Sequence, residues 1–307
     1  MNQYLVEKKQ LINIKFKINK LSYKHKILST IYYPYKGIKS LSNIFSSNNN
    51  LRVLLFHDIR RKDFNKFKNK LEWLSKEWNF ISADDFGRMI NGDKQIIGNN
   101  LLLTFDDGFL SDYFVAKEIL NVMGIPALFF IITEFCRMED EKKQKLFLEE
   151  NLYPKWKGEI IPAHRDELVN MSIENIKYLI KSGHKIGYHT ASHQRLSNIK
   201  ENSELENEII IGANKLELLL NIQINHFSFS FGDLDSFNQQ ALKLAKSRYK
   251  FVYTGMRGNN SKHLNPLAIR RDTIAVNDSN NLVGSFLLGA ADFVYKEKFN
   301  IYESWIH

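Results

Sequence analysis

The stretch "LLLTFDDG" at residues 101–108 determines how the rest of the chain is interpreted. An apolar segment runs directly into two adjacent carboxylates, Asp106 and Asp107, and then into a glycine. A short apolar run that ends in turn-forming residues predicts a buried strand. Two like charges at the end of a buried strand repel one another and need compensation. A cation bound by one of the two carboxylates would supply it.

On both sides of this stretch, segments that predict strands alternate with segments that predict helices. The further predicted strands are residues 52–58, 126–133, 184–190, 224–231, 250–255 and, as a short last strand, 267–274. The predicted helices are residues 64–74, 83–90, 112–123, 173–182, 202–220, 235–248 and 280–289. Apolar strands separated by helices predict parallel βα units covered on both faces. The fold class is therefore α/β, and about seven such units are enough to close a distorted (β/α) barrel.

The positive charge of the chain is concentrated at its start. Residues 1–50 contain nine lysines and one glutamate, so they carry +8 of the formal net charge of +9. The segment "SSNNN" at 46–50 predicts a boundary between a basic helical arm, 1–50, and a catalytic domain, 51–307. The arm has two interpretations: a segment that makes peripheral contact with an anionic membrane surface, or a solvated helix packed on the outside of the domain.

Other locations and partners are disfavoured. The arm has no arginine and the body is almost neutral, so we expect no nucleic acid partner. No apolar run approaches the ~20 residues of a membrane span, and lysines interrupt the start of the chain, so no signal peptide is expected. These features predict a cytoplasmic protein, or one at the inner face of the membrane.

Several predicted strands end in residues that can carry out chemistry. His57 follows the first strand, Asp106 and Asp107 follow the next, and "HTASH" supplies His189 and His193. Because the carboxyl ends of parallel strands lie at one end of a barrel, we expect these side chains to meet. Either pattern alone is common, since an Asp-Asp-Gly is usually a turn and paired histidines arise by chance. Their occurrence at successive strand ends is far more specific.

One aspartate and two histidines are a typical ligand set for a catalytic divalent metal, since three protein ligands leave room for water and substrate. If Asp107 is the ligand, Asp106 stays ionised beside the cation. It can then act as the general base that takes a proton from the attacking water.

The motifs "LLLTFDDG" and "IGYHTASH" resemble the first two motifs of the NodB-homology polysaccharide deacetylases, carbohydrate esterase family 4. The resemblance extends from about residue 52 to about residue 274. It implies a distorted (β/α) barrel and a metal, usually Zn²⁺, held by Asp107, His189 and His193. It also implies that Asp106 is the catalytic base and that the backbone N–H of Phe231 binds the oxyanion. The expected reaction removes an N-acetyl group, or another acyl group such as formyl, from an amino sugar.

The third motif departs from the family pattern. It reads "FSFSFG" at 227–232, so Ser228 stands where the family often has an arginine that braces the catalytic aspartate. Arg270 or Arg271 is the candidate replacement, and the alternative is that either forms only a surface ion pair. The usual late histidine that acts as general acid is missing. His57, at a strand end, and His263 are the candidates to protonate the leaving amine, and the alternative donors are solvent and Asp106 itself.

The leading hypothesis is a metal-dependent N-deacetylase acting in surface polysaccharide biosynthesis. Its substrate would be an amino sugar that is nucleotide-linked, lipid-linked or part of an oligosaccharide. The first alternative is a degenerate, non-catalytic domain that binds glycan or a partner protein. The second is amide hydrolysis on a substrate that is not a sugar, since a fold alone does not fix the substrate.

Overall fold

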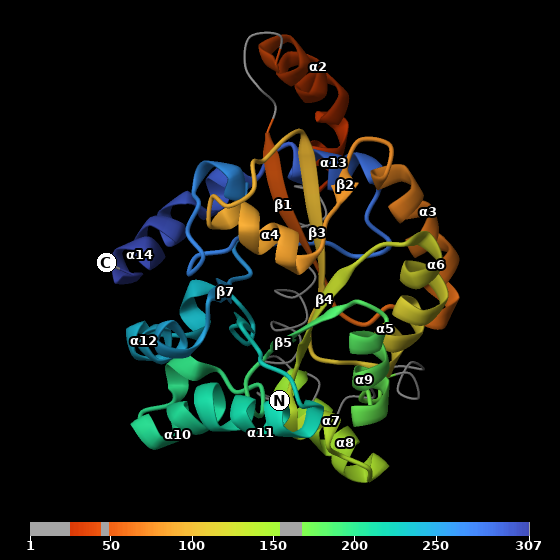
Figure 1. Ribbon diagram of the computed structural model, residues 1–307. Coiled ribbons are helices and arrows are strands. Elements are labelled where there is room, and N and C mark those ends of the chain that lie inside the picture. Colours follow the sequence, from red (N-terminus) through yellow and green to blue (C-terminus); the bar gives the residue numbers. More distant parts are fainter. Residues whose placement is uncertain (1–24, 44–48, 154–167, 307) are drawn as a thin grey trace, which may run out of the picture.

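A curved parallel β-sheet forms the centre of the molecule (Figure 1). The computed structural model describes residues 25–43, 49–153 and 168–306. Along the sheet the strands follow the order β7-β6-β5-β4-β3-β1-β8, and β2 pairs with β3. The strands are β1 Asn50–Phe56, β2 Asn79–Phe80, β3 Asn99–Phe105, β4 Ala127–Ile131, β5 Lys185–Tyr188, β6 His226–Ser228, β7 Phe251–Tyr253 and β8 Asp272–Thr273.

The register of the sheet brings the functional ends of its strands together. The longest pair, β1 and β3, is aligned from Asn50 opposite Asn99 to Phe56 opposite Phe105. Every pairing in the sheet is parallel, so the residues that follow the strands all lie at the same edge of the sheet, the one formed by the carboxyl ends. His57 and Asp106, which follow β1 and β3, therefore start at the same level.

The prediction of a distorted (β/α) barrel is confirmed. The outermost strands β7 and β8 form no ladder with each other, and a single parallel bridge between Tyr253 and Ile269 joins the two edges. The later strands are shorter than the sequence predicts. Thus β6 ends at Ser228, and β8 has only two residues.

The helices lie where the sequence predicts them, with additions. They include α3 Phe64–Leu74, α4 Ala83–Ile90, α5 Leu110–Val115, α6 Asn121–Met123, α7 Thr133–Cys136, α8 Glu141–Phe147, α9 Ile173–Lys181, α10 Asn202–Glu206, α11 Gly212–Leu220, α12 Gln239–Arg248, α13 Asn280–Leu287 and α14 Lys296–Ile306. The predicted helices 112–123 and 202–220 each contain one π-helical turn. Helix α14 was not predicted.

Alternating side chains of β1 divide the core into an inner and an outer part. Val53 points into a cluster that helix α4 covers, together with Leu102 and Tyr253. Leu54 and Phe56 point the other way, into the larger cluster beneath the outer helices. This alternation is the two-residue period of a strand that is buried on both faces.

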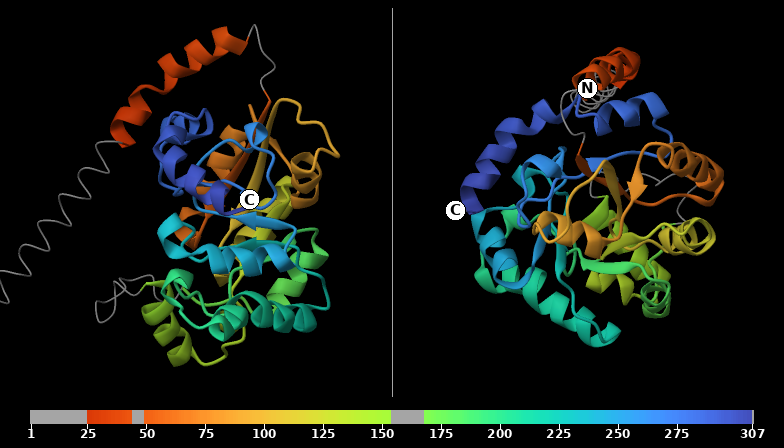
Figure 2. Two further views of the ribbon diagram at one scale, coloured as in Figure 1. Left: turned by 90° about the vertical axis from the view of Figure 1, so that its left-hand side faces the viewer. Right: turned by 45° about the horizontal axis from the view of Figure 1, so that its top comes forward.

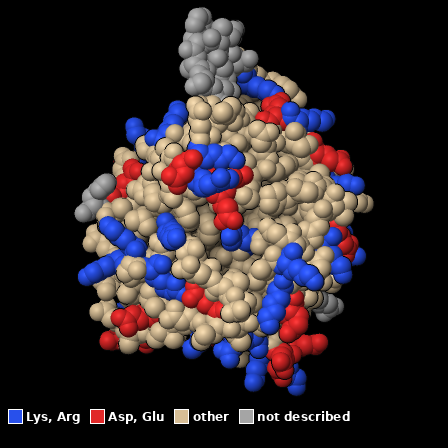
Figure 3. All heavy atoms as spheres, in the orientation of Figure 1, with Lys and Arg blue, Asp and Glu red and all other residues tan. Residues whose placement is uncertain are grey.

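The described part of the arm is helical at residues 25–30 and in α2, Tyr32–Asn43. It lies against α13 at the top of Figure 1, and Figure 2 shows it from two further sides. Among the described residues, no helix is long and apolar enough to cross a membrane. Over the face of the body in Figure 3, basic and acidic side chains are interspersed, as expected if the excess positive charge belongs to the arm.

Candidate functional site

The structure brings the predicted metal ligands together at the carboxyl ends of β3 and β5. Potential ligand atoms of Asp107, His189 and His193 all lie within 4.8 Å of one another. Oδ1 of Asp107 is 3.5 Å from Nε2 of His189 and 3.5 Å from Nε2 of His193. All three residues are buried, so the set is preorganised rather than assembled from flexible surface side chains.

The donor atoms suit a divalent cation. Oδ1 of Asp107 is buried and has no hydrogen-bond partner within the described ranges. A buried carboxylate oxygen without a partner is costly, and a cation would remove that cost. One carboxylate oxygen and two imidazole nitrogens match the ligand types and number of a catalytic zinc site. The residues present therefore fit the metal that the sequence predicts.

Backbone carbonyls orient both imidazoles. The Nδ1–H of His189 donates to the carbonyl oxygen of Ser228 at 2.9 Å, and that of His193 donates to the carbonyl oxygen of Asn151 at 3.3 Å. Because a carbonyl oxygen only accepts, the proton of each neutral ring is fixed on Nδ1. The lone pair of each Nε2 is then directed at Asp107, the tautomer that a metal ligand requires.

The loop that carries His193 is strained and held from several sides. Asp107, Thr190 and His193 have φ of 76°, 67° and 62°, in the left-handed region that side chains other than glycine rarely adopt. Such conformations cost of order 1–3 kcal/mol each and persist only where the surroundings impose them. The buried carboxylate of Glu208 supplies part of that support. It accepts from the backbone N–H of Ser192 at 3.0 Å and from its hydroxyl at 2.6 Å.

Asp106 is held by a buried arginine. Nη1 and Nη2 of Arg271 donate to the two carboxylate oxygens of Asp106 at 2.7 and 2.8 Å, and both side chains are almost fully buried. The same guanidinium donates to Oγ of Ser228 at 2.7 Å and to the carbonyl oxygen of Thr254 at 2.9 Å. The other candidate, Arg270, instead lies over the ring of Phe299.

The charge states of Asp107 and His193 favour metal binding. Burial would raise the pKa of Asp107, but His189, His193 and His57 outweigh burial and hold that pKa well below its usual range. Burial lowers the pKa of His193 to about 4, against the attraction of Asp107. Burial also opposes protonation of His189, but Asp106 and Asp107 raise its pKa. At neutral pH the site thus offers an ionised Asp107 and a neutral His193.

Phe231 lies at the rim of the site. Its φ is 62°, and its backbone N–H donates no hydrogen bond to any described residue. The residue is 38% exposed, and its ring lies 4.6 Å from the ring of His193 and is covered by the guanidinium of Arg195 at 4.7 Å. A free N–H at this turn is a suitable donor to an oxyanion.

The two histidines that are candidates for the general acid lie in different places. His57 is exposed and close enough to Asp107 to contribute to the lowering of its pKa. His263 lies near α14 instead, 3.9 Å from Glu303, with its ring tilted by 59° relative to that of Phe299. The structure brings only His57 to the site.

The sequence did not reveal three residues that build the site. Glu208 lies in the middle of a long helical pattern, and Asn151 contributes only its carbonyl oxygen. Asp112, five residues after Asp107, is fully buried, and burial together with Asp58 and Asp107 raises its pKa well above the usual range. A carboxylate on the buried side of an amphipathic helix was the available signal for Asp112 and for Glu208.

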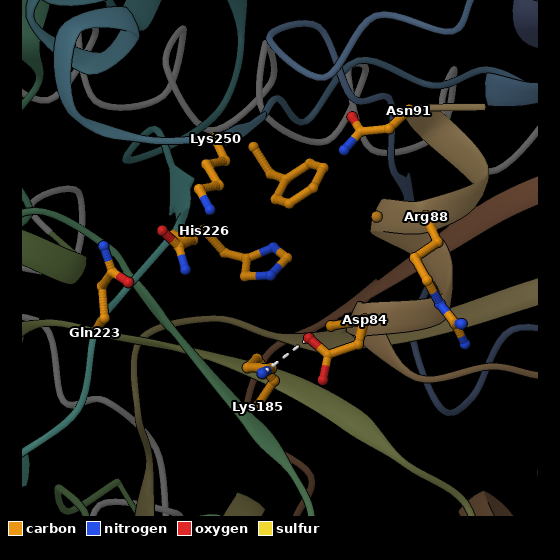
Figure 4. Close-up of a pocket in the computed structure, with 11 residues that line it drawn as sticks. Asp84, Arg88, Asn91, Lys185, Gln223, His226 and Lys250 are labelled. Atoms are coloured by element: carbon orange, nitrogen blue, oxygen red, sulfur yellow. Dashed lines mark ion pairs between the residues drawn. The ribbon is translucent and has the colours of Figure 1, made fainter. Parts of the chain in front are cut away.

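A separate cavity of about 270 Å³ opens at the opposite end of the strands (Figure 4). Lys185, His226 and Phe251, the first residues of β5, β6 and β7, line it together with α4. In this view Lys185 pairs with Asp84. None of the predicted site residues lines this cavity, so it is not part of the candidate site.

Comparisons with known proteins agree with this geometry. A family model described as polysaccharide deacetylase matches residues 94–250, just over half of the chain. The predicted polysaccharide deacetylase YxkH of Bacillus subtilis (strain 168) is 22% identical over 244 residues, covering 77% of this chain and 76% of the relative. The matched residues 94–250 include the four predicted metal and base residues and Phe231, whereas His57 and Arg271 lie outside them.

The fold is shared by solved structures, among them the following two. The deacetylase PplD of Streptococcus pyogenes, in complex with acetate, superposes with a TM-score of 0.60 at 19% identity, covering 78% of this chain and 99% of that chain. IcaB of Ammonifex degensii superposes with a TM-score of 0.61 at 20% identity, covering 79% of this chain and 99% of that chain.

Proposed function

Because this chain belongs to the polysaccharide deacetylase family, we propose that it is a metal-dependent hydrolase that removes an N-acyl group, acetyl or formyl, from an amino sugar. The observation that carries the proposal is the convergence of Asp107, His189 and His193 beside the braced carboxylate of Asp106. A metal-ligand set next to an oriented base is the arrangement that hydrolysis of an amide requires.

Asp107, His189 and His193 would hold the metal, and Zn²⁺ is the ion we propose. When bound, the cation polarises the acyl carbonyl and acidifies water. Asp106 faces the same space, with one carboxylate oxygen 3.6 Å from Nε2 of His189. In the proposed reaction Asp106 accepts the proton of the water that attacks the acyl carbon.

Two further groups complete the proposed reaction. The backbone N–H of Phe231 donates to the oxygen that becomes negatively charged as water adds to the carbonyl. The C–N bond then breaks, and the amine leaves with a proton that we assign to His57, the exposed histidine at the end of β1. One water is consumed, and a carboxylate and a free amine are released.

The brace on Asp106 favours catalysis over the alternative of a pure binding domain. Arg271 takes the place of the arginine that the third motif lacks, and Ser228 accepts a hydrogen bond from it. A domain that only bound glycan would have no need to brace a buried carboxylate with an arginine beside a metal-ligand set. The altered third motif is thus compensated by a residue from another part of the chain.

The proposed substrate is an amino sugar that is nucleotide-linked, lipid-linked or part of an oligosaccharide, modified during surface polysaccharide biosynthesis. We further propose that the protein acts in the cytoplasm or at the inner face of the membrane. A panel of nucleotide-linked, lipid-linked and oligosaccharide substrates distinguishes these three possibilities, because release of acetate or formate can be measured with the same assay for each.

The proposal is tested with three variants and a metal assay. Purified wild type should hold about one metal ion per chain by inductively coupled plasma mass spectrometry, and His189→Ala should hold far less. Asp106→Asn should retain the metal but lose release of acetate or formate. His263→Ala, which alters a histidine outside the site, serves as the matched control. Unchanged metal content in His189→Ala would remove the site, and full activity of Asp106→Asn would remove the proposed base.

A further inference from the structure

The helical segment 25–37 is fixed on the body by one of its faces. The hydroxyl of Ser285 donates to the carbonyl oxygen of Leu28 at 2.6 Å, and the hydroxyls of Ser29 and Ser279 are 3.2 Å apart. Tyr32 is 5% exposed and packs closely on Gly284 of α13. The rotation of this helical segment about its axis is therefore set by its contacts, and its remaining face is directed at solvent.

The solvent-directed face carries an apolar stripe. Ile27 is 45% exposed, Ile31 is 37% exposed and Pro34 is also exposed. Their spacing of four and three residues places them on one side of a helix. We call these three residues the outer stripe. A helix on the surface of a globular protein usually points its apolar side at the core and its polar side at solvent, so the outer stripe is unusual.

The charge of the sequence segment that carries the outer stripe points to one kind of partner. Lys26 is exposed beside Ile27, and residues 1–50 carry nine lysines against one glutamate. A helix with exposed aliphatic side chains, in a strongly cationic segment, has the two features by which interfacial helices bind anionic lipid. Nucleic acid would use the lysines but would leave the isoleucines in water. The membrane explains both features together.

We propose that the outer stripe docks this protein on an anionic lipid bilayer, with the isoleucines in the headgroup region and the lysines against the lipid charge. Two contributions add to one another. The lysines attract the protein to the anionic surface, and burial of the outer stripe in the headgroup region retains it there. The inference is independent of the proposed deacetylase activity, since it concerns a surface on which none of the site residues lies.

The full-length protein is tested by flotation with vesicles of phosphatidylcholine, with and without phosphatidylglycerol. Wild type should float with the anionic vesicles, and binding should weaken as sodium chloride screens the lysines. The double variant Ile27→Glu with Ile31→Glu should lower the partition coefficient about tenfold or more. The control is Val122→Glu with Leu218→Glu, which changes two residues that are 76% and 83% exposed on other helices. Thermal melting of both double variants should match wild type.

Three outcomes would overturn the proposal. They are equal flotation of the stripe variant and wild type, equal binding to vesicles with and without phosphatidylglycerol, and no vesicle binding by wild type. Light scattering adds a fourth. If wild type is an oligomer that does not bind vesicles, and the stripe variant is a monomer, then the outer stripe contacts a second copy of the chain instead of lipid.

Discussion

Replacing Arg271 by glutamine removes the cation that faces Asp106 in the interior of the barrel. Two charge-assisted hydrogen bonds of 2.7 and 2.8 Å are lost at a place where Arg271 is 1% and Asp106 2% exposed, so water cannot replace the guanidinium. Breaking a buried ion pair in this way typically costs about 3–5 kcal/mol. We expect a loss of that size in the free energy of unfolding at neutral pH.

The size of the effect on Asp106 is isolated by a double-mutant cycle. In an Asp106→Asn background the buried charge is gone, and Arg271→Gln then loses mainly its hydrogen bonds to Ser228 and Thr254, about 1–2 kcal/mol. The coupling between the two sites should therefore be about 2–3 kcal/mol. Urea unfolding followed by circular dichroism, with a chelator present so that metal loss does not contribute, measures all four proteins.

A surface pair provides the control for this cycle. Arg88 lies on α4, where its guanidinium pairs with Asp85, and its side chain is 61% exposed. Arg88→Gln should cost less than about 1 kcal/mol, because exposed ion pairs contribute little. If Arg271→Gln costs the same in the presence and absence of the Asp106 charge, then Arg271 does not compensate that charge and the reasoning is wrong.

Three further predictions follow from other parts of the structure. Glu208→Ala should weaken zinc affinity about 10- to 100-fold by loosening the loop of His193, whereas Glu206→Ala, an exposed control, should not; competition with a fluorescent chelator measures both. Burial lowers the pKa of His184 from 6.5 to about 4. The contribution of neutral His184 to the free energy of unfolding is therefore fully present above pH 6.5 and is lost as the pH falls towards 4. Between about pH 7.5 and 5, protonation of this residue should lower the free energy of unfolding by about 2 kcal/mol. An equal fall between the same pH values in a His184→Gln variant would contradict this. Gly212→Ala should destabilise by about 1–3 kcal/mol, since the new Cβ would overlap the Tyr188 hydroxyl; an unchanged urea midpoint would show that the contact yields.

The central strands and the helices between them could be predicted because their signals are local. The segments of β3 and α4 carry their burial pattern in adjacent residues, and Gly124 and Gly183 mark helix ends by their positive φ. The short strands β6 to β8 could not be delimited, because each depends on where its neighbour turns. The π-helical turns have no sequence signal beyond that of a helix.

The parts of the site formed by side chains at strand ends could be predicted, and the parts formed by backbone groups could not. Asp107, His189 and His193 were placed together from their positions after strands. The choice between Arg270 and Arg271 needed the structure, since adjacent residues of an extended segment point in opposite directions. The carbonyl oxygen of Asn151 could not be foreseen, because any residue type can supply one.

The distance along the chain between Asp106 and its brace has a consequence for biosynthesis. All three proposed metal ligands have been synthesised once the ribosome has passed His193, whereas Arg271 follows only after the last third of the barrel is under way. If these residues hold the proposed metal, a growing chain has its complete ligand set while β3 and β5 are pairing through β4, before Asp106 has its counter-charge. The yield of folded protein would then depend on metal supply. Asp106 would become oriented only when β8 pairs with β1 and brings Arg271 into place.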